Sequence, residues 1–211
     1  FNTYSENSSV FENNADHELF STFLINTEFP MRKKLNNSTN FLKPKIQFKL
    51  SPTNGKNISS DSVRLSYDNL FSSNRIGRTD MVEEGRSLTL GLEYEKQNLL
   101  NEKKFGFNIG SVIKDKKNRS MPSKAKLDQT RSDFVGNLFF SPSENFNLEY
   151  NFSYDRDLKF SNYDSIKTIF GSNRIVTSFD YIAENNEIGD SETISNETSV
   201  KFNNCLLYTS P

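Results

Sequence analysis

The sequence has almost none of the residues from which enzymes build nucleophile–base pairs or metal centres. Its 211 residues include one cysteine, one histidine and no tryptophan. Cys205 cannot form a disulfide within the chain, and His17 alone cannot found a zinc site. A Ser–His pair for acyl transfer would have His17 as its only possible base. We therefore expect no enzyme, no metal and no cofactor.

Long apolar runs and a charge bias are absent as well. A membrane-spanning helix needs about 20 consecutive apolar residues, and no run approaches that length, which excludes an inner-membrane helix in this sequence. The 26 basic and 27 acidic residues nearly balance and are evenly mixed along the chain. A nucleic-acid-binding protein would carry a basic patch, so this class is excluded too.

What the sequence does have is aromatic residues in a polar background. Only 34% of the residues are hydrophobic and the mean hydropathy is −0.69, yet there are 19 Phe and 8 Tyr. A disordered chain would have few aromatics. A transmembrane β-barrel has an apolar lipid face and a polar lumen, so its mean hydropathy stays low. The composition therefore favours a barrel.

Strict alternation of apolar and polar residues marks the most regular segments. In residues 86–96, Leu88, Leu90, Leu92 and Tyr94 fall on one side of an extended chain and more polar residues fall on the other. Residues 62–71 alternate in the same way. The pattern predicts nine strands, near residues 19–29, 41–50, 62–71, 86–96, 104–114, 132–141, 146–156, 173–183 and 193–203.

The connections between these strands alternate in length. Three are long and polar, at 72–85, 115–131 and 157–172, and three are shorter, at 97–103, 142–145 and 184–192. Outer-membrane barrels have long loops on one rim and tight turns on the other. We therefore predict an all-β fold, an antiparallel up-and-down meander that forms an open curved sheet, part of a transmembrane β-barrel. We expect Leu148, Tyr150, Phe152 and Tyr154 to share the lipid-facing side with Leu88, Leu90, Leu92 and Tyr94.

The chain begins at Phe1 without Met or a signal peptide, and we interpret it as an internal fragment. Residues 1–204 are expected to belong to a single outer-membrane barrel domain. Residues 205–211 break the strand pattern, and we expect them to be a non-native tail.

Charged residues in the predicted loops and polar residues on the predicted strands offer candidate sites. Asp80, Glu83 and Glu84 lack the ligand spacing of a calcium loop, so we predict ion pairs with nearby arginines, namely Arg75, Arg78 and Arg86. The basic run at 114–119 either contacts the phosphates of a glycolipid leaflet or is a solvated loop. The lumen-facing residues are expected to be hydrated, and they include Lys45, Gln47, Lys49, Glu149, Asn151 and Ser153.

Three short motifs carry a resemblance to a known family. They are Phe-Leu-Lys-Pro-Lys at 41–45, Tyr-Asp-Asn-Leu-Phe at 67–71 with the polar loop after it, and Arg-Ser-Asp-Phe-Val-Gly at 131–136. The matching positions are Pro44, Tyr67, Asp68, Asn69, Leu70, Phe71, Asn74, Arg75, Asp80, Glu84, Gly85, Ser132 and Asp133. In these motifs the chain resembles the barrel of the LptD (OstA/Imp) family, the lipopolysaccharide-assembly outer-membrane proteins. It departs from the family pattern at Arg78 and Met81, where the family has Gly and Arg.

The resemblance implies a function that involves no covalent chemistry. Such a protein would sit in the outer membrane of a Gram-negative cell and export lipopolysaccharide to the surface. Its partners would be lipopolysaccharide, a lipoprotein that plugs the barrel (LptE-like) and a periplasmic bridge protein (LptA-like). Two other interpretations stay open: another outer-membrane barrel such as a porin or receptor, and a soluble β-sandwich adhesin or lectin.

Overall fold

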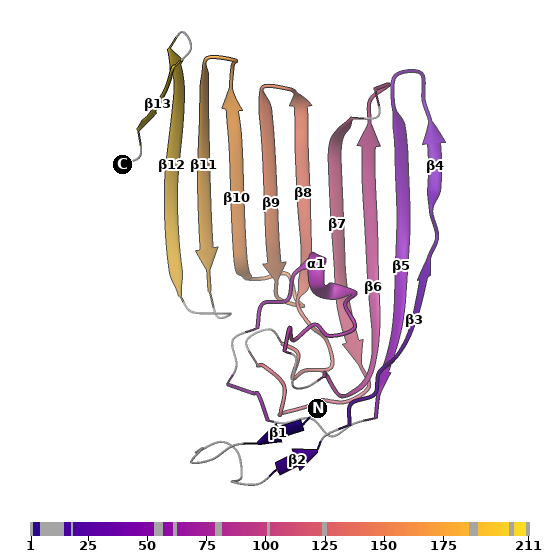
Figure 1. The fold of residues 1–211 in the computed structure, drawn as a ribbon. Coiled ribbons are helices and arrows are strands. Elements are labelled where there is room, and N and C mark those ends of the chain that lie inside the picture. The colour runs from indigo at the N-terminus through magenta and orange to yellow at the C-terminus, as the bar shows by residue number, and fades with distance from the viewer. Residues whose placement is uncertain are drawn as a thin grey trace.

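The computed structural model describes residues 2–4, 15–17, 19–52, 57–60, 63–78, 82–100, 102–123, 126–185, 190–202 and 205–209. It consists of an antiparallel sheet of 11 strands, a separate two-stranded sheet and one short helix (Figure 1). The small sheet pairs β1 (Asn2–Tyr4) with β2 (Ala15–His17). The all-β, antiparallel fold predicted from the sequence is confirmed.

The large sheet is an up-and-down meander in which consecutive strands are neighbours. Its order is β13-β12-β11-β10-β9-β8-β7-β6-β5-β3, and β4 also pairs with β5. The sheet does not close, as predicted. Its strands are β3 (Phe23–Glu28), β4 (Met31–Lys34), β5 (Thr39–Ser51), β6 (Gly85–Gln97), β7 (Lys103–Lys114), β8 (Phe134–Ser143), β9 (Phe146–Tyr154), β10 (Ser161–Gly171), β11 (Ile175–Glu184), β12 (Ser191–Phe202) and β13 (Cys205–Thr209). The pairing of β13 with β12 leaves the proposal of a non-native tail untested.

The register places the predicted apolar residues on one face. Tyr94 is opposite Phe107, Phe107 is opposite Leu138, and Leu138 is opposite Tyr150. Directly opposed residues of antiparallel strands point to the same side. The Leu88–Tyr94 and Leu148–Tyr154 sets therefore share a face, as predicted, and we call it the outer face.

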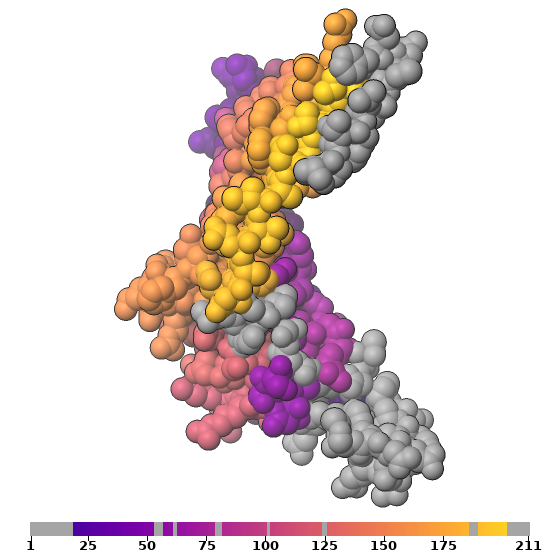
Figure 2. Space-filling model, turned by 90° about the vertical axis from the view of Figure 1, so that its left-hand side faces the viewer, coloured from indigo at the N-terminus to yellow at the C-terminus, as the bar shows by residue number. Residues whose placement is uncertain are grey.

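Large apolar side chains on the outer face are exposed in the middle of the sheet. Phe48 is 40% exposed, Leu90 41% and Phe140 41%. An apolar surface that continues from strand to strand is rare in soluble monomers and typical of a lipid-facing barrel wall. The view along the sheet from β12 shows this strand running obliquely, as expected of a twisted sheet (Figure 2).

The predicted strand at 62–71 is wrong. Residues 63–66 join no strand, and Tyr67–Leu70 form the helix α1. The alternation is real, but it arises because Val63, Leu65 and Tyr67 are buried against the sheet while Arg64 and Ser66 are not. An extended loop segment that lies on a sheet can bury every second side chain, just as a strand does.

The predicted loop at 157–172 is also wrong. Residues 161–171 form β10, which pairs along its length with β9 and β11. The segment has polar residues on both faces, and this conceals its strand character. An extra strand reverses the direction of the chain after it. The end of β11 at Glu184 and the start of β12 at Ser191 therefore lie on the rim of the long loops, not on the rim of the tight turns as the alternating lengths had suggested (Figure 1).

Candidate functional site

The long connection between β5 and β6 folds back over the sheet. We call its described residues, 57–60, 63–78 and 82–84, the inner loop, and the face they cover the inner face. The helix α1 packs against β7 and β8 in the half of the sheet nearest the loop rim (Figure 1). The motif Tyr-Asp-Asn-Leu-Phe, which carries part of the family resemblance, therefore packs directly against the inner face of the sheet.

Two glycines make room for this packing. Gly91 of β6 is directly opposite Gly110 of β7. A Cβ at Gly91 would lie 2.6 Å from Cζ of Phe71, and a Cβ at Gly110 would clash with Cδ2 of Leu70 and lie 2.7 Å from the carbonyl oxygen of Leu90. Glycine in a strand commonly marks such a close approach. Leu70 is completely buried there.

Polar side chains of the strands hold the same segment. Gln47 Nε2 donates to the carbonyl oxygen of Phe71 at 2.6 Å, and the hydroxyl of Tyr67 donates to Glu93 Oε1 at 3.1 Å. The ammonium of Lys45 lies 4.6 Å from the ring centroid of Phe71, within cation–π range. Burial and the neighbouring Glu93 raise the pKa of Tyr67, which keeps its hydroxyl protonated as the donor.

The returning end of the inner loop carries a buried charge cluster. Glu83 Oε2 lies 3.1 Å from Lys49 Nζ and 3.4 Å from Arg75 Nε, and Glu83 Oε1 lies 2.7 Å from Lys114 Nζ. All four side chains are at most 5% exposed. The nearby cations outweigh the effect of burial and lower the pKa of Glu83 to about 2. Glu83 is therefore ionised at neutral pH and ties the loop to β5 and β7.

Nearer its start, the inner loop contacts the same inner face at two strands distant from β5, namely β10 and β11. Arg64 Nη2 lies 2.6 Å from Glu184 Oε2 of β11, and its guanidinium lies 4.1 Å from the ring centroid of Tyr163 of β10. The loop therefore spans the inner face from β10 and β11 to β5, and it has charged contacts at both ends.

The core of the described structure lies between the loops and the inner face. The loop at 115–133 joins it: Ser120 accepts a hydrogen bond from the backbone of Ile58 at 2.8 Å. Of the ten buried hydrophobic residues only Val112 and Val135 are on strands; the others are Ile58, Val63, Leu65, Tyr67, Leu70, Ile76, Met121 and Leu127. The inner face beneath is filled with protein, which corrects the expectation of hydrated side chains at Gln47, Lys49 and Ser153, since all three are buried.

Pro44 is accommodated by an interruption in the neighbouring strand. Its carbonyl accepts a hydrogen bond from Phe29 at 3.0 Å, between the end of β3 and the start of β4. In an antiparallel strand the N–H and C=O of one residue face the same neighbour. The missing N–H of Pro44 therefore faces the break, and the ladder to β6 is intact.

The other motif positions shape the loops. Asn69 Oδ1 accepts the N–H of Ser66 at 2.9 Å at the start of α1, and Asn74 Oδ1 accepts that of Ile76 at 3.2 Å. Asp68 is exposed on α1. Gly85 has a φ of 93°, which favours glycine. Asp80 lies outside the described residues.

Two further motif positions fix the start of β8. Ser132 Oγ accepts the N–H of Val112 at 2.9 Å, and Asp133 accepts a hydrogen bond from Asn162 Nδ2 at 2.7 Å. Burial raises the pKa of Asp133 to about 6. The motif residues are thus structural determinants of loops and strand ends.

The sequence analysis predicted part of the charge cluster and missed the rest. The pairing of Glu83 with Arg75 is confirmed. The pairing with Lys49 and Lys114 was missed. The alternation of β5 does place Lys49 on the inner face, but no sequence signal brings a loop 34 residues later onto it.

Within the described residues, no three His, Cys, Asp or Glu side chains are grouped so that they could hold a metal ion. No helix in that part of the chain is long and apolar enough to cross a membrane.

A sequence-family model described as LptD, LPS transport system D, matches residues 2–205. The match covers the meander from β3 to β12, the inner loop and all the motif positions given above. A comparison with curated proteins gave no match.

Proposed function

Because the chain belongs to the LptD family of lipopolysaccharide transport proteins in the outer membrane, we propose that it forms part of a barrel that delivers lipopolysaccharide to the cell surface. The transfer of an amphiphile needs a barrel wall with an apolar and a polar face, and it needs no catalytic residues. The exposed apolar outer face and the buried polar inner face match such a wall.

The observation that carries this proposal is that protein fills the half of the inner face nearest the long loops. A general porin needs an open aqueous lumen. Here the inner loop is held by the charge cluster at one end and by Arg64 at the other, over a floor made by Gly91 and Gly110. This segment would therefore act as barrel wall and lumen filling, which favours a dedicated exporter over a solute pore.

The open edges of the sheet support a larger barrel. Strand edges cannot face lipid with unpaired backbone groups. The sheet ends at β3 and β4 on one side and at β13 on the other. We propose that residues 1–204 belong to one barrel domain that further strands complete, and that residues 205–211 are not native to it.

The exposed part of the inner face suggests where partners of the protein would bind. Near the turn rim, Glu149 of β9 and Lys167 of β10 are opposite each other on the inner face and exposed. Here the inner face is exposed and not covered by the described part of the inner loop. It would suit a lipoprotein plug, and a periplasmic bridge protein would deliver the lipid.

Depletion of the protein in a Gram-negative cell tests the function. We expect lipopolysaccharide to accumulate on the periplasmic side of the outer membrane while the uptake of small solutes stays normal. If solute uptake collapses and surface lipopolysaccharide is unchanged, the protein is a porin.

Cysteine labelling in intact cells tests the orientation, in a Cys205→Ser background. Lys117→Cys, in an exposed loop, should react with a membrane-impermeant reagent, and Glu144→Cys, in the exposed turn between β8 and β9, should not. The opposite result would invert the barrel, and equal labelling of both sites would indicate a soluble protein.

A further inference from the structure

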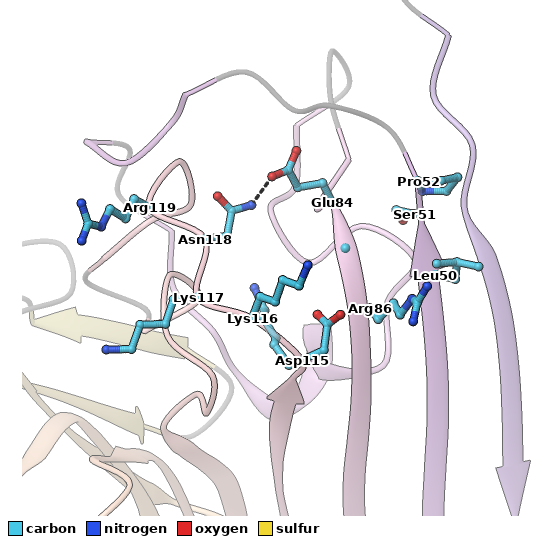
Figure 3. Close-up of a pocket in the computed structure, with 12 residues that line it drawn as sticks. Leu50, Ser51, Pro52, Glu84, Arg86, Asp115, Lys116, Lys117, Asn118 and Arg119 are labelled. Atoms are coloured by element: carbon cyan, nitrogen blue, oxygen red, sulfur yellow. Dashed lines mark hydrogen bonds between the residues drawn. The ribbon is translucent and has the colours of Figure 1, made fainter.

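A pocket on the loop rim is lined mainly by basic residues. It has a volume of about 480 Å³ and lies between the ends of β5, β6 and β7 and the loop after β7 (Figure 3). Its lining includes five basic side chains and two acidic ones, Glu84 and Asp115. Lys114 is engaged with Glu83, and the other four bases are exposed; we call them the rim cations, Arg86, Lys116, Lys117 and Arg119.

The four rim cations outnumber the two carboxylates that line the pocket. One of these carboxylates, Glu84, accepts a hydrogen bond from Asn118 Nδ2 at 2.5 Å. Figure 3 shows Arg86, Asp115, Lys116 and Glu84 between the strand end at Leu50 on one side and Lys117 and Arg119 on the other. The pocket therefore presents an excess of positive charge to whatever occupies it.

The position of the pocket relative to the apolar outer face identifies its surroundings. Arg86 is opposite Leu50, and both belong to the outer-face row that continues through Leu88 and Leu90. One strand step of two residues, about 7 Å, separates Arg86 from Leu88. The basic charge thus begins where the apolar band ends, which is the level of lipid headgroups.

An apolar hollow lies on the outer face just below this level. It has a volume of about 380 Å³ and is lined by Leu90, Ile109, Ile113 and Phe134, with Arg131 at its edge. A hydrocarbon chain fits such a lining, and an inorganic anion does not.

We propose that the rim cations bind the phosphate groups of a phosphorylated glycolipid in the outer leaflet, with one of its acyl chains in the apolar hollow. This inference rests on the proposed function, because the loop rim must face the outer leaflet. The site would bind the glycolipid at the membrane surface, either as it leaves the barrel or as part of the outer leaflet that surrounds the barrel.

Binding of lipid A to the full-length protein in phosphatidylcholine nanodiscs, counted by native mass spectrometry, tests the proposal. The variant combines Arg86→Gln, Lys116→Gln and Lys117→Gln. Each surface cation strengthens binding to an anionic lipid about fivefold, so this variant should lose about a hundredfold in affinity for bisphosphorylated lipid A. Raising the salt concentration should weaken binding to the wild type more than binding to the variant.

The matched control combines Lys33→Gln, Lys34→Gln and Lys96→Gln. These exposed cations lie near the turn rim, and Lys96 is on the outer-face row of β6 at the opposite end from Arg86. The control should bind as the wild type does. Hydrogen exchange in β9, distant from all six positions, verifies that both variants are folded.

Four results would overturn the proposal. The variant binds bisphosphorylated lipid A as tightly as the wild type; the control loses as much affinity as the variant; or dephosphorylated lipid A binds the wild type as well as the phosphorylated lipid does. Displacement of the lipid by millimolar inorganic phosphate would show a site for free phosphate and would also refute it. Each of these leaves the export function standing, because that function fails only in the depletion experiment.

Discussion

Replacing Glu83 with Gln should release the inner loop from the sheet. The substitution keeps the shape of the side chain and removes the only carboxylate among Lys49, Arg75 and Lys114 in the described cluster. Breaking a buried ion pair costs about 3–5 kcal/mol. The lowering of the pKa of Glu83 from 4.5 to about 2 corresponds to about 3 kcal/mol, from 1.36 kcal/mol for each pKa unit.

Hydrogen exchange of the protein in detergent micelles or nanodiscs measures this loss. A cost of about 3 kcal/mol corresponds to a protection about 150-fold lower for backbone amides of residues 63–78. Amides of β9 should be unchanged, because the barrel wall stays intact. A second substitution, Lys49→Met, should recover part of the loss, since it removes one of the cations left unpaired.

The control is Glu84→Gln, which removes the same charge one residue later. Glu84 is half-buried and outside the cluster, so its loss should cost less than about 1 kcal/mol. Equal exchange in 63–78 for the wild type and Glu83→Gln would refute the reasoning, as would an equal effect of both substitutions.

The pH dependence has a definite sign. The pKa of Glu83 is lower in the folded state than in the unfolded state, so its contribution is fully present above about pH 4.5 and is lost as the pH falls toward 2. The difference between the wild type and Glu83→Gln should therefore be constant from neutral pH to about pH 5 and shrink below it.

The packing of the strands and loops leads to three other expected outcomes. Gly110→Ala should displace α1 at a cost of about 1–3 kcal/mol and expose 63–78 to protease, whereas Gly106→Ala on the same strand meets mainly the flexible end of a lysine and should be tolerated. Leu90→Arg should lower the free energy of unfolding in lipid by about 2–4 kcal/mol if the residue lies near the bilayer midplane, and Asn151→Ala on the inner face should leave it nearly unchanged, as measured by denaturant titration in vesicles. Asp133→Asn should stabilise the protein at pH 7 and have no effect below about pH 4, because the raised pKa of this carboxyl, about 6, means that its ionised form is disfavoured in the folded state; a thermal melt at both pH values checks this.

The sequence predicts the outer face better than the inner one, for a physical reason. Lipid favours apolar side chains at outward positions, so where these are uniformly apolar, as in 86–96 and 146–154, the alternation is sufficient to assign strand and face. The inner face is covered by a loop whose contacts are specific and distant in sequence. Val63, Leu65 and Tyr67 therefore have the pattern of a strand although they belong to a loop, and no local rule separates the two cases.

β10 shows the opposite failure. Its inner positions meet a polar surface and its outer positions include Asp164 and Thr168 as well as Ile166 and Phe170. Periodicity is then too weak to detect, although β10 pairs with both β9 and β11 from Tyr163 to Phe170. A strand flanked by two good partners can tolerate polar residues that an isolated pattern would assign to a loop.

Polar contacts under the inner loop explain how the loop can be held in one register on the sheet. A purely apolar contact would tolerate sliding, because dispersion and burial have little directionality. Glu83 must satisfy partners on β5, in the loop and on β7 at the same time, and Gln47 fixes the carbonyl of Phe71. Buried ion pairs contribute little net stability compared with apolar packing, so their value here would lie in the single geometry they permit. Under the proposed export function, a lumen filling of this kind would stay in place while lipid moves past the wall, which an exporter needs and an open pore does not.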